Sequence, residues 1–321
     1  MNNTLDYTKM TREQSEQWSK AIVERLQSGD PGQIKEAAIN MTDYLRPNNY
    51  EQSFASQIMT PTSWNEAERI KALDSDQPMV MIEIEPDTAG AEQVDFGHMA
   101  ETFYPYGKRV TMSLTPVHTQ RIVKNVIELG AYSYNFRTVL TDLLSLQLAF
   151  IKDKQMLQAA QRCLAPVGVP NAYTSVPNNV LAGTTWSYGS WQRQLNVMRS
   201  TPNSLEPATC LFNHLMIGLM KDQIRQDFHS TAIAEQIFRS GNAEISMPGD
   251  GLKMISTIKK KLVLNNEYYF FTNENQLGRY IYMYEPTMLV DNKGLKVSFE
   301  IYEVFGMMFI NQAGVSKSLF S

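Results

Sequence analysis

Cysteine and proline are scarce in this 321-residue sequence, and neither positive nor negative charge is in large excess. Its two cysteines, Cys163 and Cys210, form no paired motif, which excludes a disulfide framework and a zinc ribbon and favours a reducing compartment. Fourteen prolines and 17 glycines are too few for a collagen-like or disordered chain. The formal net charge is −4 and the longest basic run is Lys259–Lys261, so the composition argues against a protein that coats nucleic acid.

Long hydrophobic runs are also missing. No segment approaches the roughly 20 apolar residues that span a bilayer. The most apolar one, CLFNHLMIGLM, is interrupted by Asn213 and His214. The first residues have neither a basic segment nor an apolar one, so no secretory signal is expected. With 43% hydrophobic residues, the chain should fold into about two globular domains without a membrane.

The stretch YPYGKRVTMSL lacks the surroundings of a phosphate-binding loop. Its Gly107–Lys108 pair would need a glycine five residues upstream and a serine or threonine directly after the lysine. Thr102 and Arg109 stand at those places instead. Apolar and polar residues then alternate over 110–114, which predicts a strand that starts from a bend at Gly107.

Other sequence signatures of enzymes do not occur. The patterns G-x-G-x-x-G, G-x-S-x-G and H-E-x-x-H are absent. Ser256 and Lys259 match S-x-x-K, but they lie in a predicted strand and the companion patterns S-D-N and K-T-G are missing. No two of the four histidines are three or four residues apart, as a metal site on one helix face would require. We therefore predict no catalytic residue, no cofactor and no metal.

Two groups of residues resemble ligand sites but have simpler explanations. Glu83 and Glu85 could form a carboxylate pair, yet a solvated strand face also places them side by side. Trp186, Tyr188 and Trp191 could stack on a base or a sugar. Aromatic residues beside glycine more often fill a junction between domains, and we expect that role here.

Residues 1–78 predict a helical arm. Thr11 has the spacing of a capping box to a glutamine three residues later. Asp30 followed by Pro31 is typical of the start of a second helix, which the sequence RPNN at 46–49 should end. Both helices are expected to be short and mostly polar, so the arm must lie on another part of the protein.

The periodicity then changes from helix to strand. Met79–Glu85 and Lys108–Leu114 each predict a strand, and the irregular chain between them predicts a long projecting hairpin. A further strand is expected over 121–127. The longest helix should cover Asn135–Arg162, a length of roughly 40 Å.

The second half mixes helices and strands. Helical patterns lie at 190–199, 206–221 and 231–240. From Met254 onward the pattern is β again. A turn at 291–294 precedes a half-buried strand in which Leu295, Val297, Phe299 and Ile301 should face inward.

Four segments, taken in order, resemble the major capsid proteins of tailed bacteriophages, whose fold encapsulin shells share. GKRVTMSLTPVHTQRIVKNVIEL is similar to the returning strand of the family's E-loop hairpin. AYSYNFRTVLTDLL is similar to the start of its spine helix. ISTIKKKLVLNNEYYFFTNENQLGRYIYMYEP resembles the exit from its axial domain, and LKVSFEIYEVFGMMFINQAGVSKSLF resembles its closing strands. The resemblance covers roughly residues 79–320.

This resemblance implies an α+β phage major-capsid fold with an N-terminal arm, an extended E-loop hairpin, a peripheral domain with a long spine helix, and an axial domain. The implied limits are 1–78 for the arm, 79–116 for the E-loop, 117–166 for the peripheral domain with its spine helix, 167–250 for the axial domain and 251–321 for the β-rich return of the peripheral domain.

The implied function is structural: self-assembly into an icosahedral shell around phage DNA. The expected partners are copies of the chain in hexamers and pentamers, with portal, scaffolding and decoration proteins, and double-stranded DNA held without sequence specificity. The expected location is the virion capsid, assembled in the host cytoplasm. The alternatives are an encapsulin-like compartment shell and a soluble α+β enzyme or ligand-binding protein.

The E-loop is the segment that we expect to contact a neighbouring subunit. Tyrosines and adjacent charges on its two strands are the candidate interface residues: Glu83, Glu85, Tyr104, Tyr106, Gly107, Lys108 and Arg109. The basic pair should face an acidic surface, either the glutamates of the partner strand or the next subunit.

Overall fold

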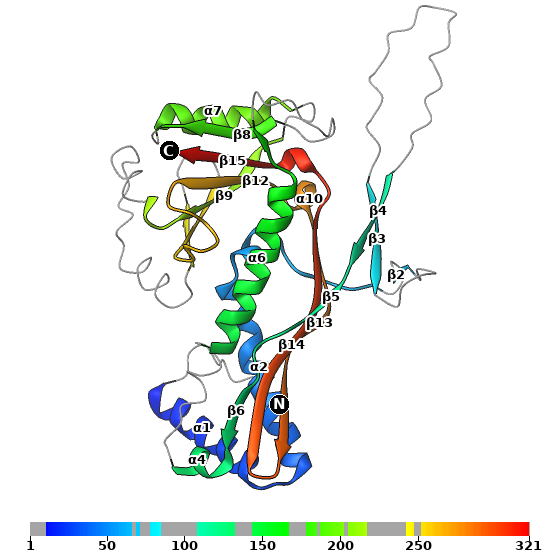
Figure 1. Ribbon diagram of the computed structural model, residues 1–321, viewed down its shortest axis with the longest axis vertical. Helices are drawn as coiled ribbons and strands as arrows, with labels where there is room; N and C mark the ends of the chain where they lie inside the picture. Colours follow the sequence, from blue (N-terminus) through cyan, green and yellow to red (C-terminus); the bar gives the residue numbers. More distant parts are fainter. Residues whose placement is uncertain are drawn as a thin grey trace, which may run out of the picture.

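A computed structural model describes most of the chain. The described residues are 11–65, 69–70, 78–84, 108–131, 143–166, 178–184, 187–201, 205–216, 242–246 and 252–320. Figure 1 shows an elongated molecule in which a seven-stranded sheet lies at one end and a long two-stranded ribbon lies at the other, with a hairpin projecting from one side.

The long ribbon dominates the lower half of Figure 1. Its antiparallel strands are β13 (Gly278–Lys293) and β14 (Lys296–Phe309). Gly294 closes their turn at φ +65°, a conformation that costs glycine little. The turn was predicted over 291–294 but lies at Gly294–Leu295, because residues 291–293 still pair with β14 as part of β13. Three short strands complete a sheet in the order β1-β13-β14-β5, with β6 pairing the end of β14 near the turn. They are β1 (Thr62–Ser63), β5 (Thr115–His118) and β6 (Ile122–Asn125).

The upper sheet has the strand order β10-β11-β9-β12-β15-β8-β7. Its strands are β7 (Ala165–Pro166), β8 (Asn178–Gly183), β9 (Pro207–Asn213), β10 (Asn242–Ser246), β11 (Lys253–Thr257), β12 (Glu267–Thr272) and β15 (Val315–Phe320). Strands from both sides of residue 250 therefore share one sheet, although a domain limit was predicted there. Pairing between distant strands has no local sequence signal, which is why this arrangement was not predicted.

The projecting hairpin is a small sheet of its own. Strands β2 (Arg69–Ile70), β3 (Met79–Ile84) and β4 (Lys108–Ser113) pair antiparallel in the order β2-β3-β4. Both strands predicted for this hairpin are confirmed. The residues that join β3 to β4 lie outside the described part of the chain.

Helices connect and cover these sheets. Helix α6 runs between the upper sheet and the ribbon, α7 lies over the upper sheet, and α1, α2 and α4 surround the lower half (Figure 1). Their bounds, with those of the short helices, are α1 (Arg12–Gln27), α2 (Pro31–Gln52), α3 (Phe54–Ile58), α4 (Val126–Ala131), α6 (Leu146–Arg162), α7 (Tyr188–Arg199), α10 (Glu274–Leu277) and the 3-10 helix η4 (Gln312–Gly314).

The largest core joins the two halves. It combines apolar residues of α1 and α2 with one face of α6, one face of the ribbon and one face of the upper sheet. A second core lies on the opposite face of the upper sheet, where Trp191 of α7 contacts Tyr268 and Phe270 with ring-centroid distances of 5.3 and 4.7 Å. The upper sheet is therefore buried on both faces.

The predicted helix starts are confirmed. The Thr11 side chain accepts a hydrogen bond from the Gln14 amide, and the Gln14 side chain caps Thr11 in return. Asp30 accepts from the Gly32 amide, with Pro31 as the first helical residue. The long helix ends at Arg162 as predicted, and its described part begins at Leu146.

Two predicted boundaries are wrong for identifiable reasons. Helix α2 does not stop at 46–49 but continues to Gln52, because buried residues before and after Pro47 hold both sides of the chain in the core. The strand predicted over 121–127 ends at Asn125, whose Oδ1 accepts a hydrogen bond from the Ile127 amide and starts α4.

The helix predicted over 206–221 is wrong where the chain is described as β9. Leu211 lies in one core and Phe212 in the other, so this strand is apolar on both faces and lacks alternation. Leu295, predicted to face inward, sits in the turn with 62% of its surface exposed. The inward positions 297, 299 and 301 are confirmed.

Thr42 ties the N-terminal arm to the ribbon and gives the first testable prediction. Its hydroxyl accepts a hydrogen bond from the Met288 amide at 3.0 Å and donates to the Ala38 carbonyl at 2.8 Å. Thr42→Val keeps the shape but leaves a buried amide without its partner, so we expect a loss of about 1–3 kcal/mol in the free energy of unfolding. Thr42→Ser keeps the hydroxyl and is the control. Equal urea midpoints for the valine variant and the native chain would contradict the prediction.

Candidate assembly surfaces and the buried charges that support them

The projecting hairpin brings some of the predicted interface residues together. The strand register places Glu83 opposite Arg109, and Ile84 opposite Lys108. Arg109 is exposed, as an interface residue of a single subunit should be.

Four of the seven predicted interface residues fall outside the described chain. They are Glu85, Tyr104, Tyr106 and Gly107. The bend expected at Gly107 and the pairing of Glu83 with Glu85 on one face therefore stay predictions.

The base of the hairpin is anchored by apolar packing. Val80, Ile82, Met112 and Leu114 are buried against residues of β13 and β14, among them Val304. The Leu114 amide also donates to the Pro78 carbonyl at 2.9 Å, which closes the hairpin base. The hairpin is therefore rigidly attached where it leaves the body.

Gly306 of β14 permits this attachment. A Cβ atom at this position would lie 2.8 Å from the carbonyl oxygen of Ser113 and 3.0 Å from a methyl group of Leu114. The first of these is backbone, so β4 would have to move to admit any side chain. Gly306 is thus required by the close crossing of β4 over β14.

A buried ion pair connects helix α6 to the ribbon. The Lys152 ammonium lies 2.9 Å from a carboxylate oxygen of Glu303 on β14, and both side chains are fully buried. Burial lowers the pKa of Lys152 and raises the pKa of Glu303, while their attraction opposes both shifts. The other Glu303 oxygen, Oε1, has no hydrogen-bond partner among the described residues, so the pair is incompletely satisfied.

The next residue of α6 makes a separate set of contacts. The Asp153 carboxylate accepts hydrogen bonds from the Ser53 hydroxyl at 2.8 Å and from the Ala55 amide at 2.9 Å, and it pairs with Lys259. Burial raises the pKa of this carboxyl, and the attraction of Lys259 lowers it. These contacts join α6 to the start of α3 and to the loop after β11.

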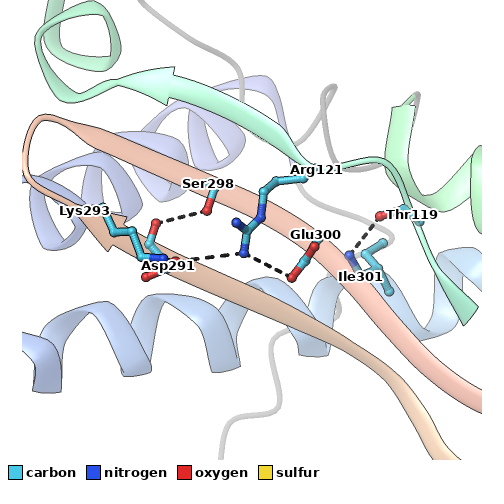
Figure 2. A network of polar contacts seen from close by, with 7 residues as sticks. All are labelled: Thr119, Arg121, Asp291, Lys293, Ser298, Glu300 and Ile301. Atoms are coloured by element: carbon cyan, nitrogen blue, oxygen red, sulfur yellow. Dashed lines mark hydrogen bonds and ion pairs between the residues drawn. The ribbon is translucent and has the colours of Figure 1, made fainter. Parts of the chain in front are cut away.

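A smaller polar network lies beside the turn of the ribbon (Figure 2). Arg121 reaches across β14, with its Nη2 atom 3.4 Å from Glu300 and 3.9 Å from Asp291. Lys293 lies 3.3 Å from the same Asp291 carboxylate. Exposed pairs of this kind add little stability. They orient the turn instead.

Residues that resembled chemical sites have structural roles. Lys259 pairs with Asp153, so the S-x-x-K match with buried Ser256 does not form a nucleophile and base. Trp191 lies in the second core, where α7 packs on the upper sheet, whereas Trp186 and the Tyr188 side chain are outside the described part, so the predicted filling of a junction between domains stays a prediction. Cys163 and Cys210 are free and buried.

The described residues form neither a metal site nor a membrane-spanning helix. Within the described ranges, no group of three or more His, Cys, Asp or Glu side chains could hold a metal ion. His118 packs on Tyr302 and partial burial lowers the pKa of His214, while His98 and His229 are not described. Among the described helices, none has the length and apolar character needed to cross a bilayer.

The buried pair gives the second testable prediction. Lys152→Met leaves Glu303 buried without its counter-charge, so we expect a loss of about 3–5 kcal/mol in the free energy of unfolding. The double variant Lys152→Met with Glu303→Leu removes both charges and should recover most of that loss. If the double variant were as unstable as the single one, the ion pair would not be the cause.

The pH dependence of the Lys152→Met variant follows from the same pair. Glu303 has a raised pKa in the folded chain. A carboxyl with a raised folded pKa gives its full contribution to stability below its unfolded pKa and loses it as pH rises through the folded one. The variant should therefore be closer to the native chain in stability at about pH 5 than at about pH 8, as measured by urea unfolding.

The third testable prediction concerns Gly306. Gly306→Ala forces the Ser113 carbonyl away from β14, and overpacking of this kind costs about 1–3 kcal/mol. We expect lower thermal stability and faster amide exchange in β3 and β4. Gly189→Ala is the matched control, because its Cβ would meet only the Ser187 hydroxyl at 3.9 Å. Equal effects of the two substitutions on β4 exchange would contradict the role of Gly306.

Comparison with known proteins identifies the fold. No protein-family model and no curated protein matches the sequence. Solved structures do match. The capsid subunit of cyanophage Pam1 is 9% identical with a TM-score of 0.54, over 84% of this chain and 92% of that one. The mature capsid of bacteriophage PhiM1 is 8% identical with a TM-score of 0.54, over 84% and 87%.

A virus-like particle from Pyrococcus furiosus is also similar. It is 12% identical with a TM-score of 0.51, over 88% of this chain and 99% of that one. In each case the match extends over most of both chains. The predicted fold class is confirmed: this chain has the α+β fold of phage major capsid proteins.

Proposed function

We propose that this chain is the major shell subunit of a tailed-bacteriophage capsid, with a structural and non-enzymatic role. The observation that carries the proposal is the extent of the structural similarity. It covers 84% of this chain and 87–92% of the Pam1 and PhiM1 capsid subunits, so the whole architecture is shared and not a common substructure.

The shape of a single subunit also supports self-assembly. The β3–β4 hairpin projects from the body (Figure 1), and the apolar contacts of its described residues with the body are at its base. An isolated two-stranded hairpin is at best marginally stable in water. A neighbouring copy would supply the missing contacts, and the same contact repeated around an axis closes into rings. Pentamers and hexamers are such rings.

The charge of the chain is consistent with a DNA container. A formal net charge of −4 gives little non-specific attraction to phosphates. Double-stranded DNA would then be enclosed without sequence recognition and released easily. Portal, scaffolding and decoration proteins are the further expected partners, and the host cytoplasm is the expected place of assembly.

The domain limits form part of the proposal. The arm would cover 1–78, the E-loop 79–116, and the peripheral domain 117–166 and 251–321, with the axial domain at 167–250. The upper sheet contains strands from both sides of residue 250, because β11, β12 and β15 pair with β8, β9 and β10 of the segment 167–250. We therefore place the axial domain around the upper sheet and the peripheral domain around the β13–β14 ribbon.

An encapsulin-like compartment is the second candidate. The chain of the Pyrococcus virus-like particle is matched over 99% of its length, so the fold also occurs in a particle that is not described as a phage capsid. The contents of purified particles distinguish the two functions: genomic DNA indicates a virus and an enzyme cargo indicates a compartment.

The direct test is assembly of the purified chain. Size-exclusion chromatography with negative-stain electron microscopy should show rings, shells or tubes. A monomer or dimer that forms no larger assembly at any salt concentration or with crowding agents would refute the proposed function and leave a soluble α+β enzyme or binding protein.

The fourth testable prediction concerns the basic pair on β4. Lys108→Glu with Arg109→Glu should reduce particle formation and leave the subunit folded, because it reverses the charge of a hairpin proposed to lie on a neighbour. Lys260→Glu with Lys261→Glu makes the same change of net charge at an exposed turn and is the control. Normal particles from the hairpin variant would remove this segment from the interface.

A further inference from the structure

An open apolar groove lies between α2 and β13 in the lower half of the molecule. Its volume is about 760 Å³. Ile39 of α2 and Leu289 of β13 line it with 51% and 41% of their surfaces exposed. Large aliphatic side chains exposed together in a concave site are typical of a surface that another chain covers.

Acidic residues flank the apolar side chain that α2 contributes. Glu36, Ile39 and Asp43 are separated by three and four residues, so they lie on one face of the helix. Glu36 has 67% of its side chain exposed, and Asp43 is also exposed. Lys35 lies one turn before Ile39 on the same helix and also lines the groove, and Arg25 lies 3.8 Å from the Glu36 carboxylate. The stripe therefore offers an apolar centre between two carboxylates.

The turn of the ribbon has the opposite pattern. We call residues Lys293–Lys296 the ribbon tip. Leu295 is 62% exposed at its centre, and Lys293 has 81% of its side chain exposed. Lys296 is exposed as well. The ribbon tip therefore offers an apolar centre between two ammonium groups.

The ribbon tip is held in a defined conformation. Gly294 adopts φ +65°, and the Leu295 carbonyl accepts a hydrogen bond from the Val126 amide at 2.9 Å. Asp291, bound by Arg121, also contacts Lys293 (Figure 2). A preorganised tip loses little conformational entropy on binding.

Leu295 does not reach the middle of the groove of its own chain, although Gly294 of the ribbon tip lines one end of it. The Met288 amide donates to Thr42, which sets β13 level with the middle of α2. Lys293, where the tip begins, is four residues beyond Leu289, or about 13 Å along a strand. Within the described part of the chain, the tip therefore leaves the space between Ile39 and Leu289 open.

We infer that the ribbon tip of one subunit docks into the α2–β13 groove of a neighbouring copy. Leu295 enters between Ile39 and Leu289, and the two lysines of the tip face Glu36 and Asp43. The contact joins two different surfaces, so each subunit both gives a tip and receives one, and successive copies form a closed ring or a continuing array. The inference rests on the proposed self-assembly and adds an interface distant from the β3–β4 hairpin.

The test is a pair of engineered cysteines, Leu295→Cys with Ile39→Cys in one chain. A disulfide needs Cα atoms within about 7 Å, which the two residues of a single chain cannot provide. Because Cys163 and Cys210 are buried, only the new thiols are accessible. Mild oxidation of assembled particles should give a ladder of covalent oligomers larger than dimers on a non-reducing gel.

Three controls separate the possible outcomes. Each single cysteine variant should remain monomeric on the gel, because a dimer from Leu295→Cys alone would indicate tip-to-tip contact and overturn the inference. Leu264→Cys with Ile39→Cys has a similarly exposed partner, Leu264 at 53%, and should give no ladder. If native particles form but the Leu295–Ile39 pair does not crosslink, the inference fails while the proposed function stands.

A charge exchange tests the flanking residues independently. Lys293→Glu with Lys296→Glu should strongly reduce assembly, and so should Glu36→Lys with Asp43→Lys. The four changes combined restore opposite charges and should recover particles. If the α2 variant assembled poorly while the ribbon-tip variant assembled normally, another segment would occupy the groove. That result would overturn the inference.

Discussion

Two adjacent charges on helix α6 determine how the halves of the molecule fit together. Lys152 is paired with the ribbon through Glu303, and Asp153 is paired with Lys259 and the start of α3. Apolar packing alone would tolerate small rotations and shifts of a helix, but a buried charge loses several kcal/mol when it leaves its partner. The two pairs point in different directions, so together they fix both the rotation and the height of α6. Every surface proposed for assembly is positioned relative to this helix.

Strand β14 carries that positioning outward because both of its faces are used. Phe299 and Ile301 face the main core with Glu303, while Val304 and Gly306 face the base of the projecting hairpin. A movement of α6 therefore changes the strand on which the hairpin rests. The same strand begins at the ribbon tip, ten residues before Gly306, or about 33 Å at the usual strand rise. One strand thus links the hairpin, α6 and the ribbon tip.

Local patterns in the sequence predicted most elements but not their pairing. Helix caps at Thr11 and Asp30 and the alternation of β14 all depend on near neighbours, and all are confirmed. Strand β9 was misread because burial on both faces removes the alternation that marks a strand.

The buried charges Lys152, Asp153 and Glu303 were not predicted, although each had a signal in the sequence. Lys152 and Asp153 interrupt the buried stripe of α6, and Glu303 continues the inward positions 297, 299 and 301. A charge at a core position predicts a buried partner of opposite charge. Lys152 and Glu303 are such a pair. The groove and the ribbon tip had no comparable signal, because they depend on how distant segments meet.

The position of β15 in the upper sheet has a consequence for synthesis of the chain. This strand, Val315–Phe320, pairs with β12 on one side and β8 on the other, near the middle of the sheet. The sheet therefore remains split until residue 320 has emerged from the ribosome. The arm and the strands of the projecting hairpin precede β15 by more than 200 residues, but the upper sheet stays incomplete until β15 is inserted between β12 and β8.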